Sequence, residues 1–128
     1  MARKIKKYYA LKETKLSLRE LIKRLVSVYH HPTSLGGIIV QRRDEPNYRS
    51  LPYDKAYICT LEVTYSNKVW KIMGAQKIND DKMLIIISGP DVNNDNFINN
   101  AKETIERLQK CSCVEVDKEH FSALWNQL

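Results

Sequence analysis

Cysteines and histidines are the residues of this chain best suited to metal binding. Cys111 and Cys113 flank a single serine, and His120 follows them closely, a grouping that suggests zinc. A structural zinc ion normally takes four ligands, commonly as two close pairs. Candidates for the fourth ligand are distant in the sequence, namely Cys59, His30 and His31. The alternative is that these cysteines only fill core and surface positions, and we predict no metal and no cofactor.

A nucleophilic enzyme needs a cysteine or serine together with a base and an orienting acid. Cys59 stands in an alternating segment without a neighbouring base, and Asp80-Asp81 stands in a polar segment of the kind where turns carry aspartate. Gly36-Gly37 lacks the further glycines and the lysine of a phosphate-binding loop. We therefore expect no enzyme activity and assign no catalytic residue.

Lysine and arginine are the remaining residues with a clear chemistry, because they neutralise phosphates. Residues 1–55 hold 13 Lys and Arg against 5 Asp and Glu, whereas residues 56–128 hold 8 against 10. This asymmetry indicates an anionic partner that meets one side of the protein. A solvated basic face that only keeps the protein soluble would show the same pattern.

The expected phosphate contacts lie in an N-terminal tail, on the first helix and in a loop beyond it. In that loop Tyr48 and Tyr53 could stack on unpaired bases. The predicted nucleic-acid-binding residues are Arg3, Lys4, Lys6, Lys7, Lys15, Arg19, Lys23, Arg42, Arg43 and Arg49.

Size and composition fit one intracellular globular domain, cytoplasmic or nuclear. The chain has 128 residues, of which 43% are hydrophobic, enough for one core. The longest apolar run, residues 83–87, is far shorter than the roughly 20 residues of a membrane span, so we expect no membrane contact. An odd number of cysteines, three, favours reduced thiols over a disulfide framework. The basic start, whose first acid is Glu13, leaves a mitochondrial presequence open.

The helix that must position the basic residues at 15, 19 and 23 is well signalled. Ser17 and Glu20 form a capping box, in which each side chain accepts from a free backbone N–H group of the first turn. Apolar residues follow at helical spacing. The helix should end near His30, because Pro32 disfavours helical geometry before it.

Alternating and continuous apolar segments predict four strands, at residues 38–42, Ala56–Tyr65, 68–75 and 83–87. Ser66-Asn67 suits a tight hairpin turn between the second and third strands. Two more helices are expected at residues 95–110 and 117–127, the latter capped by Asp117, with Val116 packing on Phe121.

The predicted fold class is therefore α+β, in the order α-β-β-β-β-α-α. We expect a mostly antiparallel sheet of about four strands with helices packed on one face. Residues 1–14 should form a basic N-terminal tail, and residues 15–128 a single domain.

The order helix, short strand, hairpin and later helix resembles a double-stranded RNA-binding domain. Residues 57–63 with 68–70 are similar to that family's central hairpin, and residues 100–102 to the start of its second helix. The resemblance implies an αβββα fold that binds RNA. The chain departs from the family in its extra apolar strand at residues 83–87. Its acidic, asparagine-rich loop stands where the family places a lysine cluster against the RNA, so that contact is not carried over.

Residues 84–89 and the helix that carries residues 101–103 resemble the closing strand and helix of a KH domain. The Gly-x-x-Gly loop with which that family clamps RNA is absent. The resemblance therefore implies no clamp.

These patterns favour a non-enzymatic RNA-binding or ribonucleoprotein-associated domain, with RNA or another polyanion as the partner. The alternative is a protein-interaction module, such as a viral accessory protein that binds a host factor or forms a homodimer. Its basis is the richness in tyrosine and the C-terminal Leu124, Trp125 and Leu128, because aromatic residues are enriched at interfaces.

Overall fold

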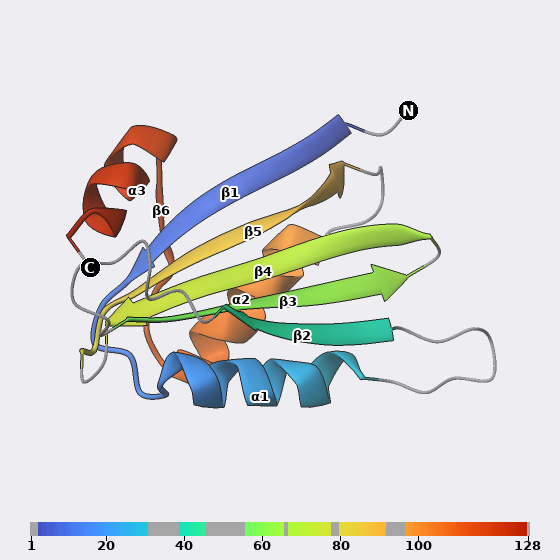
Figure 1. Ribbon diagram of the computed structural model, residues 1–128, viewed down its shortest axis with the longest axis horizontal. Coiled ribbons are helices and arrows are strands. Elements are labelled where there is room, and N and C mark those ends of the chain that lie inside the picture. Colours follow the sequence, from blue (N-terminus) through green and yellow to red (C-terminus); the bar gives the residue numbers. More distant parts are fainter. Residues whose placement is uncertain are drawn as a thin grey trace.

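A six-stranded antiparallel sheet forms the centre of the computed structural model (Figure 1). The structure describes residues 3–30, 39–45, 56–65, 67–77, 80–91 and 97–127. Within these residues, the elements in chain order are β1 (Arg3–Leu11), α1 (Leu18–Tyr29), β2 (Ile39–Glu45), β3 (Ala56–Tyr65), β4 (Lys68–Lys77), β5 (Met83–Asp91), α2 (Phe97–Gln109), β6 (Val114–Val116) and α3 (Lys118–Trp125).

The strands lie side by side in the order β2-β3-β4-β5-β1-β6. Each neighbouring pair is antiparallel, which confirms the α+β class and the antiparallel sheet. β3 and β4 form the expected hairpin, at whose turn Asn67 adopts a φ of 63°. β5 is buried from Met83 to Gly89, as its continuous apolar sequence predicts for a central strand.

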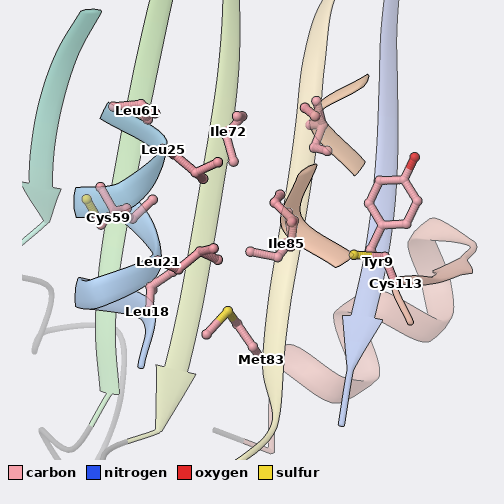
Figure 2. Close-up of a cluster of buried hydrophobic side chains, with 14 of the residues drawn as sticks. Tyr9, Leu18, Leu21, Leu25, Cys59, Leu61, Ile72, Met83, Ile85 and Cys113 are labelled. Atoms are coloured by element: carbon pink, nitrogen blue, oxygen red, sulfur yellow. The ribbon is translucent and has the colours of Figure 1, made fainter. Parts of the chain in front are cut away.

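One face of the sheet is covered by α1 and α2, and the main core lies between these two helices and the sheet. Figure 2 shows the α1 side chains Leu18 and Leu21 directed at the sheet residues Ile72 and Ile85. All four side chains are fully buried. The apolar stripe of α1 therefore packs on the sheet, as its helical spacing predicts.

The expectation that every helix packs on one face is wrong, because α3 lies on the opposite face. Phe121 of α3 packs against Leu84 and Ile86 of β5. Its ring centroid is 5.1 Å from that of Tyr8 on β1. The physical reason lies in β5, whose successive side chains are apolar on both faces and must be covered on both.

The expectation of a basic tail at residues 1–14 is also wrong, because residues 3–11 form β1. This strand pairs with β5 from Arg3 opposite Asp91 to Leu11 opposite Met83. Tyr9 and Leu11 are almost completely buried, so their burial offsets the cost of fixing a basic strand. The sheet thus has six strands instead of about four, and the element order begins with a strand; the short β6 is the other addition.

Two buried glutamines hold the start of α1 in place. The side-chain amide of Gln109 accepts from the N–H group of Leu16 at 2.7 Å and donates to the carbonyl oxygen of Leu16 at 3.0 Å. The amide oxygen of Gln76 accepts from the N–H group of Leu18 at 2.7 Å, and its nitrogen donates to the carbonyl oxygen of Asp80 at 2.8 Å. The N–H group of Leu18, which the helix leaves free at its N-terminus, is thereby satisfied by β4, and α2 holds the backbone of Leu16 just before the helix.

The predicted helix caps are present. Ser17 accepts from the N–H group of Glu20 at 3.2 Å, and α1 ends with His30 as its C-cap. Asp117 accepts from the N–H group of His120 at 2.7 Å at the start of α3. These caps confirm that α1 and α3 begin where their local sequence predicts.

Candidate nucleic-acid interface

The sheet face that carries α3 extends beyond that helix. α3 packs over one end of this face, on the side chains of Ala10, Leu84 and Ile86. The other end presents polar and basic side chains from β1, β3, β4 and β5. We call this region the open sheet face, and its residues are Lys4, Lys6, Thr60, Glu62, Val69, Lys71, Met73, Ser88 and Pro90.

The strand register brings the open sheet face together. Lys6 stands opposite Ser88, Ser88 opposite Lys71, and Lys71 opposite Glu62. Directly opposite residues in an antiparallel sheet point to the same face. Because neighbouring strands lie about 4.8 Å apart, Lys6 and Lys71 start from backbones about 10 Å apart. Their ammonium groups therefore flank β5 from both sides.

The surface between these lysines is hollowed. Two adjoining hollows have volumes of about 340 and 460 Å³, and both are lined by Lys4, Glu62, Lys71 and Ser88. Ile86 also lines the first of them. The hollows share these residues, so they form one trough that crosses four strands, with cations and a carboxylate along it.

The lysines on the open sheet face are exposed, whereas Glu62 is half-buried. Lys71 Nζ lies 4.0 Å from Glu62 Oε1, and about half of the Lys71 side chain is exposed. Lys6 Nζ lies 5.9 Å from the ring centroid of Tyr8, within the range of a weak cation–π contact. Neither Lys4 nor Lys6 forms an ion pair with an acid in the described ranges.

A second basic surface lies where α1 meets β2 and β3. The guanidinium of Arg42 donates a 2.8 Å hydrogen bond to the hydroxyl of Tyr57. The guanidinium carbon of Arg19 lies 4.8 Å from the centre of the same ring. Lys15, just before α1, and Lys23, four residues after Arg19 on α1, are exposed. Tyr57 therefore contacts two of the predicted phosphate-binding residues, Arg42 through its hydroxyl and Arg19 through its ring.

The structure divides the predicted residues instead of joining them on one surface. Lys4 and Lys6 point to the open sheet face, whereas Lys7 points away from it and pairs with Glu115 at 3.1 Å. Arg3 is exposed at the start of the same strand, in alternation with Lys4. The side chain of Arg43 and the whole of Arg49 lie outside the described residues.

Sequence reasoning missed Lys71, Thr60 and Ser88 as members of a site. A signal for Lys71 was present, because it alternates with Trp70 and Ile72, which point to the core. That alternation shows that Lys71 faces outward, but not that it shares a surface with Lys6, which is distant in the sequence.

The cysteines and histidines do not assemble into a reactive or metal-binding group in the part of the chain that the structure describes. Cys59 and Cys113 are buried, and burial raises the pKa of the Cys113 thiol to about 12. Burial also raises the pKa of Cys111. His120 is exposed at the first turn of α3. No three His, Cys, Asp or Glu side chains of the described ranges lie close enough to hold a metal ion.

Comparison with known proteins gives no relative. No protein-family model, curated protein or solved structure matches the chain. The resemblances to double-stranded RNA-binding and KH domains thus have no support from these comparisons. No helix in the described residues is long and apolar enough to cross a membrane.

Proposed function

We propose that the protein binds RNA without catalysing a reaction on it, and that the open sheet face contacts the phosphates. The observation that carries this proposal is the register that sets Lys6, Ser88 and Lys71 in one row across three strands. Lys4 adds a third cation to the same trough. Such a row offers charges at fixed spacing to a polyanion.

The other residues of the trough suit a nucleic acid as well. Hydroxyl groups of Thr60 and Ser88 line it beside the lysines, and serine and threonine commonly bond phosphate and sugar oxygens. Met73 and Ile86 provide an apolar floor on which a base or a ribose would rest. The carboxylate of Glu62, which lies beside Lys71, would repel a phosphate. We therefore place the phosphates between Lys71 and β1, along Ser88, Lys4 and Lys6.

Neither Cys111 nor Cys113 offers a ready nucleophile. Their raised pKa values keep Cys111 and Cys113 protonated near neutral pH, and a thiol in that form is a weak nucleophile.

The test is RNA affinity measured by fluorescence anisotropy at several salt concentrations, with single-stranded RNA, duplex RNA and DNA as ligands. Each phosphate contact to a single strand contributes about 0.7 to the slope of log affinity against log salt. The variant Lys6→Ala/Lys71→Ala should therefore lower that slope by about 1.4. Lys15→Ala/Lys23→Ala is the matched control, because it removes the same charge from α1 and the residues just before it.

Three outcomes are informative. Loss of affinity only in the variant of the sheet lysines supports the proposal. Loss only in the α1 variant would keep RNA as the ligand and move its site to the surface around Tyr57. Absence of binding at low salt, or binding that does not weaken with salt, would refute RNA binding.

In the last case a protein partner or a second copy of the chain becomes the better candidate. The specific observation is the outer edge of β1, where β6 pairs only with the segment from Tyr8 to Ala10. The preceding part of β1, visible at the upper side of Figure 1, has no strand beside its outer edge among the described residues. A free strand edge pairs readily with an added strand. The C-terminal residues Leu124 and Trp125 are less suitable, because they pack on the sheet.

A further inference from the structure

A separate pocket lies at the end of the sheet, between the C-terminal part of α3 and the ends of β1 and β4. Its volume is about 260 Å³. Ala10 and Leu84 of the sheet and Leu124 of α3 form its apolar side. We call it the end pocket, and its other lining residues are Leu11, Lys12, Lys77, Asp80, Lys82, Met83 and Gln127.

Three lysines from three segments converge on the end pocket. Lys12 follows β1, Lys77 is the last residue of β4, and Lys82 precedes β5. All three are exposed. None of them forms an ion pair with an acid in the described part of the chain.

Asp80, the acid that lines the end pocket, is engaged in the turn before β5. Its carboxylate accepts from the N–H group of Lys82 at 3.1 Å. Its own N–H group donates to the carbonyl oxygen of Lys77 at 3.1 Å. Its carbonyl oxygen accepts from Gln76. The positive charges around the pocket therefore exceed the negative charge, and the one carboxylate is held by the backbone.

The backbone around the end pocket is tied together before any ligand binds. The N–H group and the hydroxyl of Thr14 both donate to the carbonyl oxygen of Asp81, at 2.9 and 3.0 Å. These two hydrogen bonds join the segment that carries Lys12 to the segment that carries Lys82. A site whose backbone segments are already held together loses less backbone entropy when a ligand binds.

We propose that the end pocket binds a small amphipathic anion. The apolar chain or ring of the ligand rests on Ala10, Leu84 and Leu124, and its carboxylate or phosphate head lies among the three lysines. Small-molecule sites typically combine such apolar walls with a few polar groups that orient the ligand. This site shares no residue with the open sheet face and is independent of the proposed RNA binding.

The test is a titration of ¹⁵N-labelled protein, followed by two-dimensional NMR. Octanoate and octyl phosphate present one tail with two anionic heads, and thereby distinguish a carboxylate ligand from a phosphate ligand. Octylammonium keeps the tail and reverses the charge, and acetate keeps the head without the tail. We expect at least one of the two amphipathic anions to shift the amide signals of Lys77, Leu84 and Gln127, and the two other compounds to leave them unchanged.

Charge removal provides the second part of the test. Lys77→Ala/Lys82→Ala should weaken binding of the anion about tenfold, because two exposed ion pairs with its head group are lost and each contributes only modestly. Lys23→Ala/Lys118→Ala removes equal charge elsewhere and should leave the affinity unchanged.

Several results would overturn the proposal. Equal binding of octylammonium would show that only the apolar surface matters. Equal weakening in both double variants would show a general effect of net charge. Shifts that avoid the pocket residues, or no shifts with either amphipathic anion, would show that the end pocket is not a binding site.

Discussion

Replacement of Gln109 by methionine tests how the sheet, α1 and α2 are joined. The side chain of Gln109 is completely buried, and its amide makes both a donor and an acceptor contact with the backbone of Leu16. Methionine has a similar size and shape but offers neither bond. The substitution Gln109→Met therefore removes both hydrogen bonds to Leu16, and the 3.8 Å hydrogen bond that the amide nitrogen donates to Met83 Sδ, with little change in volume.

The expected cost follows from the groups left without partners. An unsatisfied backbone donor or acceptor costs about 1–3 kcal/mol when water cannot replace its partner. Leu16 is only half-buried, so water compensates part of the loss, and we expect a total of about 2–4 kcal/mol. That is a large share of the roughly 5–15 kcal/mol by which domains are stable.

The measurement is urea unfolding followed by circular dichroism, with the free energy of unfolding taken from the transition. Gln41→Met is the control, because Gln41 is exposed on β2 and its replacement should change stability by less than about 0.5 kcal/mol. A decrease below about 1 kcal/mol for Gln109→Met would contradict the reasoning. It would mean that the Leu16 backbone finds other partners and that Gln109 does not anchor the start of α1.

Two further predictions concern the core. A Cβ atom at Gly89 would lie 2.7 Å from Trp70 Cγ, and the Trp70 ring is stacked on Phe97 with 5.2 Å between ring centroids. Gly89→Ala should therefore cost roughly 1–3 kcal/mol and shift Trp70 fluorescence to the red in a Trp125→Phe background; an unchanged emission maximum would show that the ring is not displaced. Burial raises the pKa of Tyr9 to about 12 from its usual 10.0, so the folded state holds this proton more tightly than the unfolded state. The free energy of unfolding should fall by up to about 3 kcal/mol as the pH rises from the usual pKa of tyrosine to the raised pKa of Tyr9. In urea unfolding, the first part of this loss should appear between about pH 8 and about pH 11, and Tyr9→Phe should lose less stability over that range. Equal losses in both proteins would contradict this account.

The sequence by itself determined those elements whose signals are local. Ser17, Glu20 and His30 mark the ends of α1 through contacts that span only a few residues. The alternation of Ala56–Tyr65 indicates a strand with one buried face, and Asn67 marks the turn after it. The apolar run that begins at Met83 indicates a central strand. Each signal depends on backbone geometry within one element.

The strand β1 was not predicted, although part of its signal was present. Ile5, Tyr9 and Leu11 recur at a period of two, but Lys7 occupies the position between Ile5 and Tyr9 on the same face, and four cations surround them. Only the pairing with β5, far along the chain, buries Tyr9 and Leu11 and makes this segment a strand.

The tertiary structure alone decided which surfaces exist. The sequence indicated that Lys71 faces outward and placed Lys6 in a tail, whereas their common surface depends on the order in which β1, β5 and β4 lie side by side. The packing of Phe121 on the far side of β5 likewise decided which end of that face is covered. Caps and side-chain periodicity act within a few residues, whereas strand order and register come from hydrogen bonds and burial between segments distant in the sequence.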